Sequence, residues 1–372
     1  MIQYRDILFK NFLIFGLLFF LIFFIGNLSF YEFQTYIFNV KTWIRDSYIL
    51  NYFDYGFIKR GLIGTLLGVR ISDVSIVRPD LLISDSLTKY INFISIILIL
   101  IIVVLYIILM NKIFESERKL LILLAISPFA FLNFGYDAAR YDQIGIIYFL
   151  LFCIFIEKKK ILSFLVLLSP FFLLIQETNL FIISPFVFFY IYFFEKRKFL
   201  NLYLLLANVI VLLFLYYFGD AEYTKDTYIW PFHAYFDPSK TFFEKNLFWW
   251  QKLFNFKTTI IYRHFFAILI FLILNFYFIN KFKKYFHIKK FIFSIFFCFS
   301  PILILAIDHS RYVSNYIFIF SIFLITIANR EKYFSNVKIP NYYYLVFFIG
   351  PFGVSYSLPY LTIYKKILLS FI

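Results

Sequence analysis

The chain has 372 residues, of which 63% are hydrophobic and 25% aromatic, and its mean hydropathy is +0.83. Soluble domains are only about half apolar, so this composition excludes a water-soluble fold. The formal net charge of +15 would suggest nucleic-acid binding in a soluble protein. Here the basic residues interrupt apolar runs, which is typical of membrane topology and lipid contact. We therefore expect a membrane protein with membrane lipid as a partner and without nucleic acid.

Apolar runs follow one another along nearly the whole chain. A spanning helix needs about 20 mostly apolar residues. The sequence therefore predicts an all-α, polytopic transmembrane helix bundle of about eleven spans, forming a single transmembrane domain over residues 1–372. The first run lacks a signal-peptidase type of cleavage site and is expected to be retained. The expected spans lie near residues 12–25, 91–111, 120–134, 143–156, 161–175, 180–194, 200–218, 260–279, 291–307, 313–328 and 341–357.

The short loops between these runs alternate in charge. One set of loops is rich in Lys and Arg. The loops of the other set, at 135–142, 176–179 and 308–312, contain only two such residues, Arg140 and Arg311. Positive residues favour the cytoplasmic side, so we expect the basic loops and the N-terminus inside. The basic loops are 111–119, 157–160, 195–198, 281–290 and 330–338.

Two longer segments, 29–90 and 219–258, then lie on the outer side. Both mix aromatic and charged residues, which predicts helices on the membrane surface. The abundance of Phe, Tyr, Ile and Lys, which AT-rich codons specify, indicates a bacterial gene. The expected location is therefore the bacterial inner membrane, with both segments in the periplasm.

Proline recurs after serine inside the apolar runs. Proline in a spanning helix frees a carbonyl group and kinks the helix, which opens space between helices. Tolerated proline and a cavity lined by kinked helices are both compatible with this pattern. The four pairs are Ser127-Pro128, Ser169-Pro170, Ser184-Pro185 and Ser300-Pro301.

Ionisable and amide side chains gather at the outer ends of the spans and in the first outer segment, whereas the middles of the spans are almost wholly apolar. Charged groups at these positions are costly unless water, a partner or a substrate meets them. Each of them alone could be a solvated surface group, but as a set they predict a site. The candidate residues are Asp54, Lys59, Arg60, Asp137, Arg140, Asp142, Gln176, Glu177, Asp308, His309 and Arg311.

The types of these residues are complementary. Carboxylates can take a proton from a hydroxyl group or hold a divalent cation, and Lys and Arg bind phosphate oxygens. Glycines at 56, 61 and 64 would let backbone amides beside Lys59 and Arg60 approach an anion. His309 suits either a proton carrier or a hydrogen-bonded helix end. Nucleotide-binding and zinc motifs do not occur in the sequence. A lipid-linked, phosphorylated substrate at the outer face fits this set.

The chain resembles the bacterial O-antigen and capsule repeat-unit polymerases (Wzy-type) and the related GT-C polytopic glycosyltransferases. The likeness lies in ten or more aromatic-rich spans, two sizeable outer segments, and acidic and arginine residues on the outer side. The stretch Asp54-Tyr55-Gly56-Phe57-Ile58-Lys59-Arg60-Gly61 looks like the acid-bearing first loop of GT-C enzymes. The resemblance covers nearly the whole chain, and its motifs are loose.

This resemblance implies polymerisation of undecaprenyl-diphosphate-linked oligosaccharides on the periplasmic face, alone or with other polysaccharide-assembly proteins. Asp54 would be the acceptor base, with Glu177 and Asp308 behind it. Lys and Arg side chains would hold the diphosphate. Asp137 and Asp142 would orient these side chains or bind a divalent metal ion as a cofactor. The expected cations are Lys59, Arg60, Arg140 and Arg311.

Two alternatives remain open at this point. One is a GT-C glycosyltransferase that adds a single sugar from a polyprenyl-phosphate donor. The other is a flippase for lipid-linked oligosaccharides, which should carry charges along the middle of its helices facing a cavity. The charges here gather at the outer ends of the spans, and this distribution favours an enzyme.

Overall fold

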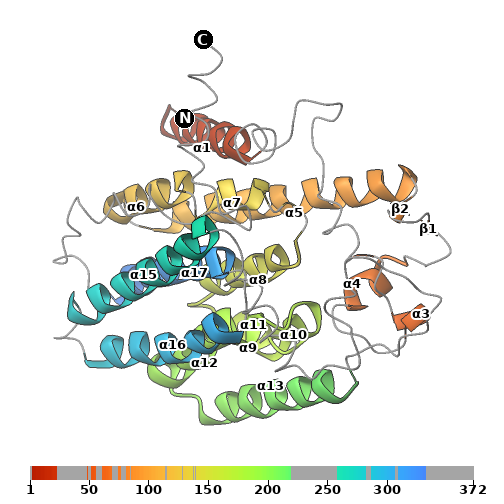
Figure 1. Ribbon diagram of the computed structural model, residues 1–372. Coiled ribbons are helices and arrows are strands. Elements are labelled where there is room, and N and C mark those ends of the chain that lie inside the picture. The colour runs from red at the N-terminus through yellow and green to blue at the C-terminus, as the bar shows by residue number, and fades with distance from the viewer. Residues whose placement is uncertain are drawn as a thin grey trace.

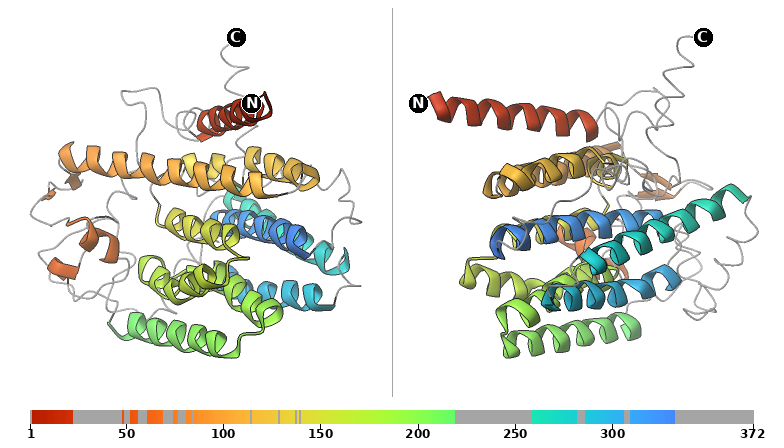
Figure 2. Two further views of the ribbon diagram at one scale, coloured as in Figure 1. Left: turned by 180° about the vertical axis from the view of Figure 1, so that it is seen from behind. Right: turned by 90° about the vertical axis from the view of Figure 1, so that its left-hand side faces the viewer.

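The structure is a computed structural model in which stacked helices form the body of the molecule (Figure 1). Two further views place α1 and α13 on opposite faces of the stack (Figure 2). The residues that it describes are 2–22, 48, 52–55, 61–68, 74–76, 81–83, 85–113, 115–127, 129–136, 138, 140–218, 258–281, 286–305 and 309–331.

Helices dominate the described residues and fall on the predicted runs from the first through 313–328, so a helical fold is confirmed. The predicted run at 341–357 lies outside the described residues. In chain order the helices are α1 (Ile2–Phe20), α3 (Tyr52–Tyr55), α4 (Gly61–Leu66), α5 (Asp85–Lys112), α6 (Glu115–Ile126), α7 (Phe131–Tyr136), α8 (Asp142–Ile154), α9 (Lys159–Leu168), α10 (Phe171–Ile175), α11 (Asn179–Ile182), α12 (Ser184–Tyr190), the π-helix η4 (Ile191–Glu195), α13 (Lys198–Phe218), α15 (Thr258–Lys281), α16 (Phe286–Leu305) and α17 (His309–Glu331).

The predicted outer segment 29–90 contains a pair of strands in place of the helices alone that were predicted there. Strands β1 (Val74–Ile76) and β2 (Leu81–Ile83) pair antiparallel. The β-branched residues Val74, Ile76 and Ile83 favour strands, and the proline and aspartate between the two runs are typical turn residues. The segment also holds α3 and α4, which are short, and most of the second outer segment lies outside the described residues.

Two of the described helices are long and apolar enough to cross a membrane, at Lys89–Lys112 and Lys198–Phe218. Several other apolar helices are shorter. Three of the predicted runs are divided near a Ser-Pro pair: α6 ends before one, α9 and α10 flank the next, and α11 gives way to α12 at the third. Proline lacks the N–H group that would continue the ladder of hydrogen bonds, which accounts for these divisions. Pro301 instead lies within a continuous α16.

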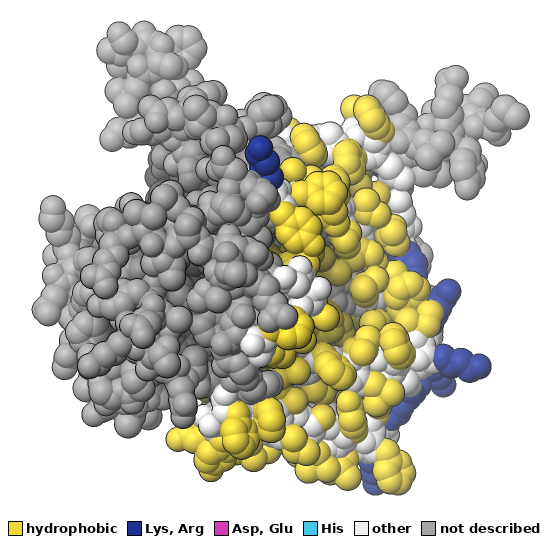
Figure 3. Space-filling model, turned by 90° about the vertical axis from the view of Figure 1, so that its right-hand side faces the viewer, with side chains coloured by type: hydrophobic (Ala, Val, Ile, Leu, Met, Phe, Trp, Pro, Cys, Tyr) yellow, Lys and Arg dark blue, Asp and Glu magenta, His cyan; other side chains and the backbone are white. Residues whose placement is uncertain are grey.

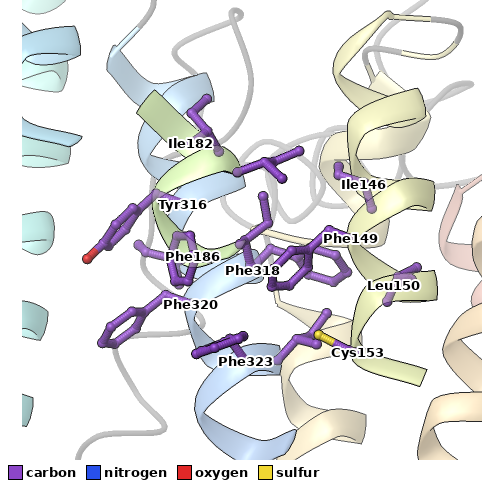
Figure 4. Close-up of a cluster of buried hydrophobic side chains, with 14 of the residues drawn as sticks. Ile146, Phe149, Leu150, Cys153, Ile182, Phe186, Tyr316, Phe318, Phe320 and Phe323 are labelled. Carbon is purple, nitrogen blue, oxygen red and sulfur yellow. The ribbon is translucent and has the colours of Figure 1, made fainter. Parts of the chain in front are cut away.

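Helix α17 forms the centre of the core, and its side chains from Arg311 to Ile327 are buried. Its aromatic rings pack against those of α8 and α12 (Figure 4). Phe323 makes an edge contact with Phe186, with ring centroids 5.5 Å apart, and stacks on Phe291 of α16 at 4.9 Å. Close packing of large rings therefore fixes the position of α17 among its neighbours.

Helix α13 buries polar residues and exposes apolar ones. Its buried residues include Asn201 and Asn208, whereas Leu202, Ile210 and Tyr217 are 53%, 62% and 71% exposed. The side-chain amide of Asn201 can donate to the carbonyl oxygen of Phe188 in α12 and accept from the backbone N–H of Tyr192 in η4, at 3.2 Å each. These bonds lie where the α-helix changes to a π-helix. Apolar side chains cover a broad exposed face of the molecule (Figure 3). Faces of this kind mark membrane or protein contact sites.

Two glycines offer a matched test of the packing of α1. A Cβ atom at Gly135 of α7 would clash with the backbone carbonyl oxygen of Ile22, whereas one at Gly16 would meet nothing within 4 Å. Because backbone cannot yield as a side chain end can, we expect Gly135→Ala to lower the free energy of unfolding by about 1–3 kcal/mol. Gly16→Ala should be neutral or slightly stabilising, since alanine favours helix.

Thermal unfolding of both purified variants in the same detergent measures the difference between them. Equal unfolding temperatures would contradict the close contact between α7 and the end of α1.

Candidate functional site

The carboxylate that begins α8 contacts two arginines. Oδ2 of Asp142 lies 3.4 Å from Nε of Arg140 and 3.5 Å from Nε of Arg311. Asp142 occupies the first turn of α8, where the partial positive charge of the helix end stabilises a carboxylate. Arg311 lies in the first turn of α17. The beginnings of two helices that are distant in sequence therefore meet at one carboxylate, and we call these three residues the Asp142 cluster.

The Asp142 cluster is largely shielded from solvent. The side chains of Asp142 and Arg311 are 7% and 3% exposed, and that of Arg140 is 16% exposed. The guanidinium carbon of Arg311 lies 4.0 Å from the centroid of the Tyr312 ring, a cation–π contact. Buried guanidinium groups bind phosphate oxygens strongly because water competes little with them. The cluster therefore has the side-chain chemistry of an oxyanion site.

Tyr141, between two members of the cluster, connects it to the segment 29–90, the predicted first outer segment. Its ring makes an edge contact with Tyr48, with centroids 5.0 Å apart. Two causes raise the pKa of the Tyr48 phenol well above its ordinary value of 10: burial is the larger, and the nearby Tyr141 phenol is the smaller. Like any tyrosine, the phenol is protonated and can donate a hydrogen bond at neutral pH, and the raised pKa extends this to more alkaline pH. Tyr48 is not among the predicted site residues, because tyrosines are too frequent in residues 29–90 for one to stand out.

Buried amides continue from the cluster into the bundle. Nε2 of Gln143 donates to the carbonyl oxygen of Phe134 at 3.0 Å. Nδ2 of Asn133 on α7 lies 3.4 Å from Oδ1 of Asn315, one helical turn beyond Arg311 on α17. These buried amides are not among the predicted site residues, because the middles of the spans are predicted to be almost wholly apolar. An asparagine within an apolar run is the signal that would have found them.

In another buried asparagine, both the amide nitrogen and the amide oxygen are hydrogen-bonded. Asn275 of α15 donates to the carbonyl of Phe271 at 2.8 Å and accepts from the Tyr316 hydroxyl at 2.5 Å. We interpret this pair as a structural bond between α15 and α17. Asn133 differs, because its Oδ1 is buried without a hydrogen-bond partner among the described residues.

The beginning of α11 packs against α8 close to the cluster, and the turn before it holds Gln176 and Glu177. Nε2 of Gln176 donates to Oγ1 of Thr178 at 3.1 Å. A Cβ atom at Gly145, one turn after Asp142, would lie 2.8 Å from Oδ1 of Asn179. Glycine at this position thus allows the beginning of α11 to approach α8. Glu177, in the same turn, is partly exposed.

The structure thus brings three predicted residues together, Arg140, Asp142 and Arg311, with Gln176 and Glu177 in a neighbouring turn. Their use in binding or catalysis stays a prediction. Asp54 belongs to α3 and His309 begins α17, but the placement of both side chains lies outside the described part of the chain. The remaining candidates also lie outside it, namely Lys59, Arg60, Asp137 and Asp308.

Metal ligands were expected only in the form of a divalent cation held by carboxylates. Among the described residues, His, Cys, Asp and Glu do not form a group of three or more that could hold a metal ion. Cys153 is buried and Cys298 is partly buried, and both are free thiols.

A similar ion cluster lies at the other end of α17. Glu195 of η4 pairs with Arg330 at 3.2 Å and with Arg197 at 3.4 Å, and it accepts a hydrogen bond from Tyr190 at 3.3 Å. The side chains of Arg330 and Arg197 are 26% and 29% exposed, so they are more hydrated than that of Arg311. Both ends of α17 are therefore clamped by a carboxylate between two arginines.

Comparison of the chain with protein-family models, curated proteins and solved structures found no match.

Proposed function

We propose that the chain is a multi-pass enzyme of the bacterial inner membrane that polymerises undecaprenyl-diphosphate-linked oligosaccharide repeat units on the periplasmic face. In this proposal the Asp142 cluster faces the periplasm and binds the diphosphate of the lipid-linked donor. The observation that carries the proposal is the pair of shielded guanidinium groups meeting at the beginnings of α8 and α17. Both helix beginnings add partial positive charge where an oxyanion would bind.

The distribution of polar residues on α13 supports embedding of the bundle in lipid. In a soluble protein the exposed face of a surface helix is polar and its buried face is apolar. Here the buried face carries Asn201 and Asn208 while the exposed face is apolar. Polar residues between helices and apolar residues outside are typical of membrane bundles. The shorter, proline-divided helices would cross the bilayer as pairs in this arrangement.

The proposed reaction needs a base, an acceptor and a stabilised leaving group. A carboxylate would remove the proton of an acceptor hydroxyl, whose oxygen then forms a bond to the anomeric carbon of the donor. The bond between that carbon and the diphosphate oxygen breaks, and the lipid diphosphate leaves with the electron pair. Arg140 and Arg311 would stabilise the negative charge that develops there. Asp142 would position the two arginines, and the base would be Asp54, Glu177 or Asp308.

Deletion of the gene in its host separates this proposal from its alternatives. A polymerase predicts surface glycan that carries one repeat unit and no longer chains, because the units are still made and exported. Loss of all repeat units would contradict polymerisation and favour the flippase or an earlier transferase. A single missing sugar within otherwise polymerised glycan would favour the GT-C glycosyltransferase.

A further inference from the structure

Two four-residue segments of nearly identical composition precede α9 and α13. The first is Glu157-Lys158-Lys159-Lys160 and the second is Glu195-Lys196-Arg197-Lys198. Each segment carries three basic residues and one acidic residue. The first ends at Lys160, the second residue of α9, and the second ends at Lys198, the first residue of α13. We call them the basic tetrads. Their function is not explained by the site at the opposite end of α17.

Two hydrogen bonds place the basic tetrads side by side. Nη1 of Arg197 donates to Oγ of Ser163 at 2.7 Å, and farther along the same helices Tyr203 donates to the carbonyl of Leu167 at 2.8 Å. Both sequence positions increase between the first contact and the second, so α9 and α13 run in parallel. Their basic ends therefore lie together at one edge of the bundle.

The positive charge of the basic tetrads is mostly exposed. All the lysines of the two tetrads are exposed, while Glu195 is occupied by its two arginine contacts. Cations at the beginning of a helix oppose its macrodipole, so these lysines do not serve the stability of α9 and α13. Neither helix has an acidic residue in its first turn to offset them. The surface is thus suited to a partner that brings negative charge.

An exposed apolar surface begins directly after each tetrad. On α9, Ile161 and Phe164 are 37% and 59% exposed, and on α13, Phe199 and Leu202 are 91% and 53% exposed. Figure 3 shows Lys and Arg side chains gathered along one edge of the exposed apolar face. A soluble anion would use only the charged edge. A phospholipid would use both surfaces, because its anionic headgroup and its acyl chains are adjacent in the same molecule.

We propose that the basic tetrads and the exposed apolar residues after them bind an anionic phospholipid. The phosphate of the headgroup contacts the lysines of both tetrads, and the acyl chains lie along α9 and α13. This inference rests on the proposed embedding in a membrane but not on glycan polymerisation. Its readout is therefore stability in defined lipid, so its failure is distinct from a failure of the enzymatic proposal.

The test uses the full chain purified in an uncharged detergent. Thermal unfolding is followed with a thiol-reactive dye, which reports the two free thiols, the buried Cys153 and the partly buried Cys298, as they become exposed. Three probes are added separately: phosphatidylglycerol, phosphatidylcholine with the same acyl chains, and glycerol phosphate. We expect phosphatidylglycerol to raise the unfolding temperature by at least about 2 °C more than either of the others, because each lysine near the headgroup adds to binding.

A matched pair of variants locates the effect. Lys159→Gln combined with Lys198→Gln should lose most of the additional shift, whereas Lys289→Gln combined with Lys290→Gln, which removes the same charge from exposed positions of α16, should retain it. Lys160→Gln with Lys196→Gln repeats the test if the first variant does not fold. An equal shift with phosphatidylcholine or with glycerol phosphate, or an equal loss in the α16 variant, would overturn the proposal.

Discussion

Arg311→Ala is expected to reduce the rate of glycan chain growth by at least about 100-fold, the usual effect of removing one donor to a developing oxyanion. Arg311 is 3% exposed, meets Asp142 and stacks on Tyr312, so its guanidinium group is held in place before substrate binds. Arg311→Lys keeps the charge but loses the planar fork, and it should recover only part of the rate. The measurement is extension of purified lipid-linked repeat units by the purified variants.

Arg330→Ala is the matched control, because Arg330 lies on the same helix and also pairs with a carboxylate. It should leave the rate within a few-fold of the unsubstituted protein when both are compared below their unfolding temperatures. If Arg330→Ala and Arg311→Ala reduce chain growth equally, the effect comes from loosening α17, and the assignment of Arg311 to the diphosphate is wrong.

Asp142→Ala is expected to lower the free energy of unfolding by about 3–5 kcal/mol, because it leaves two shielded guanidinium groups without their shared carboxylate contact. Glu195→Ala should cost less. Its arginines, at 29% and 26% exposed, can be hydrated when the carboxylate is lost. Unfolding temperatures of both variants in one detergent measure this difference.

Asp142→Asn provides the finer control, since it keeps the shape and removes the charge. It should be destabilised less than Asp142→Ala while still losing activity, because the arginines would no longer be positioned by an anion. An Asp142→Ala protein as stable as Glu195→Ala would show that the cluster is more hydrated than its exposed fractions indicate.

The order and positions of the helices could be predicted from sequence. Apolar runs and the basic loops between them extend over many residues, so a single atypical residue does not hide them. The lengths of the helices could not be predicted. Ser169-Pro170 and Ser184-Pro185 indicate kinks, but whether the chain divides, as between α9 and α10, or continues, as at Pro301, depends on neighbouring groups that satisfy the freed carbonyls. The β1–β2 hairpin was missed because short apolar strands resemble fragments of apolar helices.

The members of the candidate site could be predicted only as a set. Charge at the outer ends of the spans identified Arg140, Asp142 and Arg311, because isolated charge beside a bilayer is costly. Sequence could not show that Asp142 would bridge the two arginines, since contacts between helices depend on packing angles. Asn133 and Asn315 were missed for the same reason, as their pairing joins α7 to α17.

The two ion clusters of α17 share a composition but differ in setting. At the Glu195 end, exposed lysines and exposed apolar rings adjoin the cluster, which suits contact with lipid. At the Asp142 end, buried amides from α7, α8 and α17 extend inward, which suits a bound polar ligand. This difference is the physical basis for placing substrate chemistry at one end of the bundle and lipid anchoring at the other.

The most direct test of the central claim is binding of undecaprenyl diphosphate to the purified protein, compared with undecaprenol, which lacks the phosphates. We predict saturable binding of the diphosphate that weakens at least about tenfold when Arg140 and Arg311 are both replaced by glutamine, and no comparable change for undecaprenol. Equal affinity for the two lipids, or unchanged diphosphate affinity in a folded Arg140→Gln/Arg311→Gln variant, would contradict the account.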